Sequence, residues 1–503
     1  MTDLSYLELL RLAAPEAILV LTLLSLLAAD FAGLRGLPQR SRLTLSALLV
    51  VVGCVLAAGW LLGIASSGEI LPGMLVSDSL TRLLKVVILL LAAVTAVVSV
   101  DHGFTEHTAE YFAMLLLSTL GMMFLVSAED LLMIFVSLEL TSLSLYILVA
   151  FNKGSSASAE AALKYFLFGG VAAAFTLFGL SLVYGITGST NLGEIGAHFC
   201  VKGSGTLALD PLLVLALVLT VVGFGFKVAA VPFHLWAPDV YQGAPGPVAA
   251  FIASGSKVAS FFILAKLLLV GFKGVEGTPT LTGGVAGWMP LLALMAVASL
   301  ILGNLAAIVQ TSVRRLLAYS AIAHAGYMLV GFMATGAESL TAIIYYTITY
   351  AITALGAFAV VLAVQAGVGN DRLQDFAGLS RRSPLLSACL VVFLLSLAGI
   401  PPLAGFFGKF YVFASALNTA NGSLSALWLV LLALGMSAVS LYYYLQVLKQ
   451  VYVLPSAPGA TPLQVAFPTA FAVLVLAALT VLFGCAPQML IGPLLTAVRL
   501  AGF

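Results

Sequence analysis

Charged residues are scarce in this chain. Asp, Glu, Lys and Arg make up 8% of its 503 residues, whereas hydrophobic residues make up 62%. A water-soluble fold could not cover so much apolar surface, so the composition predicts a polytopic membrane protein. The net charge of +1 gives no reason to expect nucleic acid or an acidic substrate as a ligand.

Cysteine is equally sparse. The four cysteines are scattered, form no CxxC motif and do not cluster with histidine: Cys54, Cys200, Cys389 and Cys485. This argues against an iron–sulfur or zinc site, and no GxGxxG nucleotide motif follows a predicted strand. We therefore expect no cofactor or metal in this chain. The first 21 residues also lack the basic segment and cleavage site of a signal peptide, so the first apolar run should be a true span.

Apolar runs of about 18 to 28 residues are the dominant pattern, and each is long enough to cross a bilayer as a helix. Fourteen such spans are predicted, near residues 12–34, 43–66, 79–100, 110–127, 130–151, 158–187, 210–235, 245–272, 288–309, 315–333, 339–366, 385–414, 425–448 and 465–495. The fold class is therefore an all-α polytopic membrane protein.

The basic residues in the loops predict the orientation, because short cytoplasmic loops retain Lys and Arg. With the amino terminus outside, ten fall in inner loops: Arg35, Arg40, Arg42, Lys153, Arg314, Arg315, Arg372, Arg381, Arg382 and Lys449. Four fall in outer segments: Arg11, Lys202, Lys273 and Arg499. Both termini are expected outside.

Prolines interrupt two of the predicted spans, the seventh at Pro232 and the twelfth at Pro401-Pro402. The breaks are five spans apart, and this odd separation makes two five-helix units enter the membrane from opposite sides, as in the inverted repeats of transporters. Four units are predicted: three N-terminal helices in 1–105, a five-helix repeat in 106–273, a second inverted five-helix repeat in 285–452 and a C-terminal helix in 460–503.

Lysines inside the spans are the candidate functional residues. An ammonium at bilayer depth costs about 3 kcal/mol or more, so such residues normally face protein or water and mark an ion pathway. Lys227 precedes the first break, Lys409 follows the second, and Lys257 lies about 18 Å into the eighth span. Glu139 is the only carboxylate predicted deep in a span, and it is the expected partner of Lys227. That pair could be purely structural, but burial of an ion pair contributes little to stability, which favours a functional role.

Several other polar residues have two interpretations. Lys164 should share Glu139, and His234 and His324 could bridge lysines as proton carriers, although a lone histidine is often structural. Three basic residues near span ends are expected to anchor the helices by snorkelling: Arg82, Lys85 and Lys266. Two tyrosine clusters are expected to serve packing: Tyr345-Tyr346 and Tyr442-Tyr443-Tyr444.

Four segments together resemble the antiporter-like membrane subunits of respiratory complex I. They are LEL around Glu139, ALKYFLFGG around Lys164, FKVAAVPFHLWAPDVYQGAPGPVAAFIASGSKVA at 226–259 and AGIPPLAGFFGKF at 398–410. The resemblance extends from about residue 75 to 450. Lys409 stands where sister subunits L and M usually carry glutamate, so the chain is most similar to the subunit N family of NADH-quinone oxidoreductases.

The resemblance implies a proton-translocating subunit without a redox centre. Glu139 and Lys227 would form a modulating pair, Lys257 the central relay group and Lys409 the terminal group. Lys164 and His234 would be accessory members, and His324 stays a candidate relay residue from its place in a span. NADH, FMN, iron–sulfur clusters and quinone would be bound by partner subunits. The expected neighbours are the antiporter-like subunit M and the small subunits K and J, in a bacterial inner membrane with both termini periplasmic.

Two alternatives remain open at this point. A subunit of a multisubunit sodium/proton antiporter would need oxygen ligands for sodium, and midplane carboxylates beyond Glu139 are not apparent. A non-transporting scaffold would leave the lysines as structural pairs, yet Lys257 and Lys409 have no evident anion in the sequence. The intramembrane lysines therefore favour proton transport over both alternatives.

Overall fold

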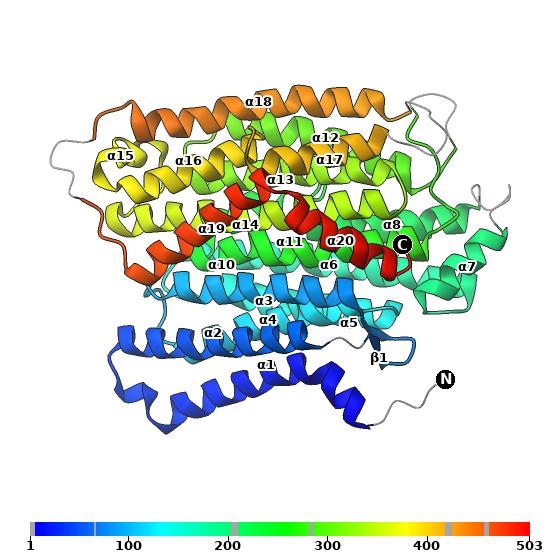
Figure 1. The fold of residues 1–503 in the computed structure, drawn as a ribbon, viewed down its shortest axis with the longest axis horizontal. Helices are drawn as coiled ribbons and strands as arrows, with labels where there is room; N and C mark the ends of the chain where they lie inside the picture. Colours follow the sequence, from blue (N-terminus) through cyan, green and yellow to red (C-terminus); the bar gives the residue numbers. More distant parts are fainter. Residues whose placement is uncertain (1–5, 65–66, 203–209, 281–284, 418–424, 457–461) are drawn as a thin grey trace.

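We describe the protein from a computed structural model that covers residues 6–64, 67–202, 210–280, 285–417, 425–456 and 462–503. Its long helices lie roughly parallel to one another and to the longest axis of the molecule (Figure 1). Within these ranges, 13 helices are long and apolar enough to cross a membrane. One further crossing is broken into two shorter apolar helices, α16 (Pro384–Ala398) and α17 (Ala404–Leu417). The predicted all-α membrane fold of about fourteen spans is confirmed.

The N-terminal part forms the lower edge of the molecule in Figure 1. It contains α1 (Tyr6–Ala32), η1 (Leu34–Gly36), α2 (Gln39–Gly63), β1 (Gly68–Leu71), β2 (Leu75–Ser77) and α3 (Ser79–Ser99). The antiparallel strands β1 and β2 are an addition to the predicted helical fold. Asp78 then caps α3, because its carboxylate accepts the Thr81 backbone N–H at 2.7 Å.

The middle of the chain contains the first broken crossing. Its elements are α4 (Thr108–Ser127), α5 (Leu131–Val149), α6 (Ser156–Thr187), α7 (Leu192–Lys202), α8 (Pro211–Val228), α9 (Trp236–Gly243), α10 (Gly246–Phe251), η3 (Ile252–Ser256), α11 (Lys257–Lys266) and η4 (Leu267–Gly271). Both η3 and η4 are π-helical. Such segments are frequent at functional sites, and η3 ends directly before Lys257.

The second half packs around one long helix, α14. Besides α16 and α17, its elements are α12 (Trp288–Ile308), α13 (Val313–Val330), η5 (Gly331–Met333), α14 (Ala337–Val368), η6 (Leu373–Phe376), α15 (Leu379–Arg382), α18 (Leu427–Tyr452), α19 (Phe467–Cys485) and α20 (Gln488–Leu500). Helix α14 is buried along most of its length and contacts helices from both halves, including α10, α11, α16 and α17.

The two predicted breaks are confirmed, although the first begins earlier than expected. Helix α8 ends at Val228, four residues before Pro232, where Ala229 adopts a left-handed φ of 58°. Proline removes a backbone donor and clashes with the preceding turn, so the helix stops before it. At the second break, α16 ends with Gly399 at φ 87° and the chain passes Pro401-Pro402 before α17. Val231-Pro232 and Pro401-Pro402 are both cis.

The last predicted span, 465–495, is wrong as a single helix. Helix α19 ends at Cys485 and α20 begins at Gln488, and the two meet at an angle in Figure 1. Pro487 lies at the junction, and its ring prevents α19 from continuing. Helix α20 therefore turns across the flank of the bundle, where it contacts α14.

Helix α1 begins and α20 ends at the same end of the bundle, the right-hand end in Figure 1. This agrees with an even number of crossings, whereas the side of the membrane on which this end lies stays a prediction. The division into four units and the inversion of the repeats likewise stay predictions. Residue 460, where the C-terminal unit was predicted to begin, lies outside the described residues.

Candidate functional site

Lys227 lies in the last turn of α8, directly before the first break. Its ammonium donates a hydrogen bond to the Ser142 hydroxyl on α5. Glu139, also on α5, is half buried and acts electrostatically on Lys227. Among the described residues, however, no ion pair joins Glu139 to Lys227. The structure therefore places the predicted partners near each other, with Ser142 as the direct ligand of the lysine.

Lys257 is the first residue of α11 and is 1% exposed. Its ammonium donates to the Ala321 carbonyl on α13 and lies 5.3 Å from the centre of the Tyr350 ring on α14. Neither neighbour is an anion. His324, three residues after Ala321, is also 1% exposed, and its ring lies 4.9 Å from that of Tyr350. A backbone carbonyl and the face of a tyrosine ring thus stabilise the ammonium, since cations are attracted to ring faces.

His324 is held by two tyrosines from different helices. Its Nδ1 lies 2.7 Å from the Tyr346 hydroxyl on α14, and its Nε2 lies 3.3 Å from the Tyr444 hydroxyl on α18. Tyr444 also shares a hydrogen bond with Ser320. A phenol can both donate and accept, so it can pass a proton along such a chain. We expected these tyrosines to serve packing, whereas Tyr346 and Tyr444 also bind His324 through their hydroxyl groups.

Lys409 lies on α17 beside the second break and is 4% exposed. Its ammonium donates to the Ala398 carbonyl at 3.0 Å and to the Ser437 hydroxyl at 2.8 Å. Ala398 is the last residue of α16, where a carbonyl lacks its helical partner, so the break itself supplies a ligand for the lysine. Lys409 also lines a cavity of about 350 Å³ together with Ser437 and Gly399.

Aromatic rings connect Lys257 of α11 with Lys409 of α17 through His324. Lys409 lies 4.5 Å from the centre of the Tyr327 ring, and Tyr327 lies 5.7 Å from His324. On the other side of His324, Tyr350 leads to Lys257. The series Lys257, Tyr350, His324, Tyr327 and Lys409 is therefore continuous through the core. Because its members can all carry or orient a proton, it has the composition of a relay.

Lys164 lies elsewhere and does not share Glu139 as predicted. It pairs with Glu160 and with Asp239, each at 2.7 Å, and its side chain is 39% exposed. Arg315 contacts the same Asp239 carboxylate at 2.8 Å. Glu160 is four residues before Lys164 on one helix, which brings the two side chains together. Lys164 therefore belongs to an ionic network that joins α6, α9 and α13.

His234 lies within the first break and is 6% exposed. Its Nδ1 is buried and has no hydrogen-bond partner among the described residues. The predicted site residues thus divide into three places. Lys257, His324 and Lys409 are linked where α11, α13 and α17 pack on α14, Glu139 and Lys227 lie near each other beside the break that holds His234, and Lys164 stands apart.

The prediction that Lys85 and Lys266 reach to the membrane surface as helix anchors is wrong. Lys85 is fully buried and pairs with Glu16 of α1 at 2.7 Å, and Lys266 is buried and pairs with Glu129 at 2.6 Å. Each ammonium finds an anion inside the protein, so it does not need to reach the membrane surface. Glu16 is 5% exposed inside a membrane-crossing helix, so Glu139 is not the only deep carboxylate.

Breaking the Glu16–Lys85 pair should destabilise the protein strongly. We expect Lys85→Met to lower the free energy of unfolding by about 3–5 kcal/mol, because it leaves the Glu16 carboxylate buried without a counter-ion. The double variant Lys85→Met with Glu16→Leu should recover most of this loss. Thermal unfolding of the detergent-solubilised protein would measure both. Equal stability of the single and double variants would contradict the pairing.

No cluster of three or more His, Cys, Asp or Glu side chains fit for a metal ion occurs in the part of the chain that the structure describes. The cysteines there are all free. The buried polar residues include ammonium, imidazole and hydroxyl groups, which suit proton transfer.

Comparison with known proteins gives one consistent family. Residues 128–438 match the model described as NADH:quinone oxidoreductase/Mrp antiporter, TM. NADH-quinone oxidoreductase subunit N 2 of Acidobacterium capsulatum is 52% identical over 97% of this chain and 99% of its own length. The subunit N protein of Trichlorobacter lovleyi is 37% identical over 98% of this chain and 97% of its own.

Solved structures agree. A chain of respiratory complex I from Thermus thermophilus is 35% identical, covers 95% of this chain and 98% of its own, and has a TM-score of 0.76. A chain of the Mrp complex from Dietzia has a TM-score of 0.81 over 97% of each chain at 22% identity, which shows a shared fold. From these matches over nearly its full length, the chain belongs to the subunit N family of NADH-quinone oxidoreductases.

Proposed function

We propose that this chain carries protons across the membrane as a membrane-arm subunit of a proton-translocating NADH-quinone oxidoreductase. The observation that carries the proposal is the pair of buried lysines, Lys257 and Lys409, joined through His324, with no carboxylate among the described residues as a direct partner. A permanent structural charge would be expected to have a counter-ion. An ammonium held only by carbonyls, hydroxyls and rings can lose its proton at lower cost, as a relay requires.

Each site residue has a proposed role. Glu139 modulates Lys227, Lys257 is the central relay group and Lys409 the terminal group, and Lys164 and His234 are accessory. At an effective dielectric constant of about 20, moving two unit charges from ~4 to ~8 Å apart changes their interaction by about 2 kcal/mol. That is more than a tenfold change in proton affinity, so a small displacement of Glu139 would load or release a proton on Lys227.

The redox steps are proposed to belong to partner subunits, which would bind NADH, FMN, the iron–sulfur clusters and quinone. The proposed neighbours are subunits M, K and J in a bacterial inner membrane, with both termini on the periplasmic side. The placement of basic residues in the loops supports this orientation. Quinone chemistry would then act on this chain only through its neighbours.

A sodium/proton antiporter subunit is the second candidate, favoured by the shared fold with the Mrp complex. The two differ in the transported ion. In proteoliposomes containing the whole complex, NADH oxidation should acidify the lumen at the same initial rate with and without ~10 mM Na⁺. Sodium prefers hard oxygen ligands, whereas the buried relay candidates of this chain are lysines and histidines: Lys257, Lys409, His234 and His324. Sodium-dependent acidification together with uptake of radioactive sodium would support the antiporter instead.

A further inference from the structure

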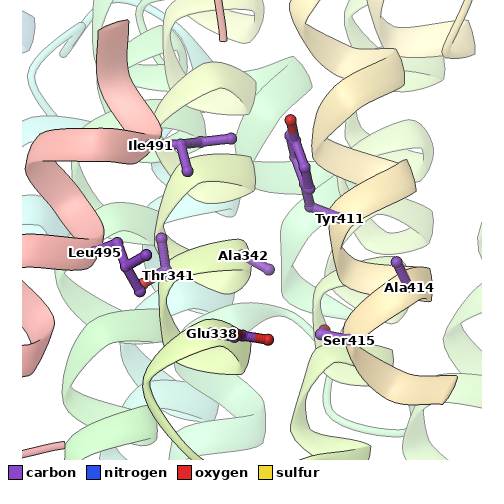
Figure 2. A pocket seen from close by; sticks show the side chains of 8 residues that line it. All are labelled: Glu338, Thr341, Ala342, Tyr411, Ala414, Ser415, Ile491 and Leu495. Carbon is purple, nitrogen blue, oxygen red and sulfur yellow. The ribbon is translucent and has the colours of Figure 1, made fainter. Parts of the chain in front are cut away.

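A cavity of about 260 Å³ lies beneath helix α20 and shares no residue with the proposed relay. Three helices line it with residues one turn apart: Glu338 and Ala342 of α14, Tyr411 and Ser415 of α17, and Ile491 and Leu495 of α20. Figure 2 shows Glu338 and Ser415 at one end and Tyr411 and Ile491 at the other. The cavity therefore runs along the helices, from the first turn of α14 toward the middle of that helix.

The interior of this cavity suits a hydrocarbon chain. Two hydroxyl groups in its wall are already bonded within their own helices. Thr341 donates to the Ala337 carbonyl at 2.6 Å, and Ser415 donates to the Val412 carbonyl at 2.9 Å. The wall that α20 contributes is aliphatic. An apolar cavity of roughly 150 Å³ can bind a benzene molecule in a protein, so this larger cavity has room for a segment of an acyl chain.

Glu338 lies at the depth of the lipid headgroups. The 32 residues of α14 extend about 48 Å at 1.5 Å per residue, whereas the hydrocarbon core of a bilayer is about 30 Å thick. The ends of this helix therefore project into the headgroup layers. Glu338 is exposed in the first turn, and its carboxylate takes part in none of the ion pairs or side-chain hydrogen bonds found among the described residues. An anionic group thus stands at the mouth of an apolar cavity.

A basic group lies close to the same turn of α14. Lys273 lines a second cavity, of about 290 Å³, together with Thr335 and Gly336, which directly precede α14. Glu276 shares this second cavity, but its carboxylate accepts the Gly274 backbone N–H at 2.9 Å, which holds it against its own loop. The start of α14 therefore has a carboxylate at one cavity and an ammonium at the next, as a zwitterionic headgroup requires.

We propose that a phosphatidylethanolamine molecule binds here, with an acyl chain beneath α20, its ammonium on Glu338 and its phosphate on Lys273. A primary ammonium donates charge-assisted hydrogen bonds to a carboxylate, whereas the fully methylated ammonium of phosphatidylcholine has no N–H to donate. Phosphatidylglycerol offers no cation to Glu338. The bound lipid fastens α20 to α14 and α17. This site goes beyond the proposed function, because it does not depend on the ion that the chain transports.

Photo-crosslinking in the assembled complex tests the site. The probes are phosphatidylethanolamine, phosphatidylcholine and phosphatidylglycerol with a photoreactive diazirine on one acyl chain, and mass spectrometry locates the labelled peptides. Phosphatidylethanolamine should label the cavity-lining peptides of α14, α17 and α20 about tenfold more than the other two lipids, because its ammonium is hydrogen-bonded to a charged group. Equal labelling by all three lipids, or no labelling of these peptides, would overturn the proposal.

Substitutions separate the headgroup from the acyl chain. Glu338→Gln should lower labelling by phosphatidylethanolamine about tenfold, and Glu338→Lys should make phosphatidylglycerol the preferred lipid. Ala342→Phe should fill the cavity and remove labelling by every lipid, whereas Ala342→Ser should not. Glu194→Gln, at an exposed carboxylate of α7, is the matched control and should be labelled normally. Unchanged labelling in Glu338→Gln would refute the headgroup contact, and unchanged labelling in Ala342→Phe would refute the chain site.

Discussion

Replacing Lys227 by alanine is expected to stop proton pumping and to slow quinone reduction about 100-fold in an assembled complex. The ammonium that Ser142 binds and that Glu139 stabilises from a distance would be gone, and a positioned proton-transfer group contributes about 10²–10⁴-fold. Electron transfer should fall as well, because a coupled machine cannot turn over when its proton step is blocked. Pumping and quinone-reductase assays on the same membranes would measure both losses.

Two comparisons separate this loss from misfolding. The amount of assembled complex on a native gel should be unchanged, since a group half buried beside a helix break contributes little to packing. Ser142→Ala, which removes only the ligand, should reduce both activities less than Lys227→Ala does. Full activity of Lys227→Ala, or loss of the complex from the gel, would contradict the role proposed for Lys227.

Replacing Lys409 should have the second large effect, and arginine is the informative substitute. Arginine keeps the positive charge beside the Ala398 carbonyl but does not lose its proton in proteins. We therefore expect Lys409→Arg to pump about tenfold or more slower than the unmodified complex, although its charge is preserved. If a fixed charge were all that the site required, Lys409→Arg would be nearly as active as the original.

A matched substitution provides the control for Lys409. Arg→Lys exchange at an exposed position such as Arg381 should change neither pumping nor quinone reduction. Ser437→Ala removes the second ligand of Lys409 and should have an intermediate effect. If Lys409→Arg kept nearly the original activity while Ser437→Ala lost some of it, titration of this lysine would not be required.

Composition and hydrophobic runs were sufficient to predict the membrane fold. In lipid, the backbone N–H and C=O groups must be hydrogen-bonded, so the chain forms long apolar helices, and these are broken only where neighbouring protein or water can bind the exposed backbone groups. The breaks at Pro232 and Pro401-Pro402 were predictable for this reason. The bend between α19 and α20 was not, because Pro487 stands inside an otherwise continuous apolar run. Only the packing of α20 against α14 shows that the chain turns there.

The site was predictable in part. Buried lysines are visible in any sequence with long apolar runs, so Lys227, Lys257 and Lys409 stood out. Their partners did not, because contacts between distant helices depend on the fold. Tyr346 and Tyr350 are one turn apart on α14, so they lie on the same face of that helix. Only the structure shows that His324 packs against this face. The pairing of Lys85 with Glu16 was hidden in the same way.

The most direct test of a proton relay through buried lysines is the number of protons pumped per electron pair by the complex with Lys257→Met. Methionine is close to lysine in length and apolar, so the packing around Ala321 and Tyr350 should survive. Lys153→Met, at an exposed loop lysine, is the matched control. The relay predicts assembled complexes in which Lys257→Met loses pumping and Lys153→Met keeps it. An unchanged proton-to-electron ratio in Lys257→Met would contradict the relay.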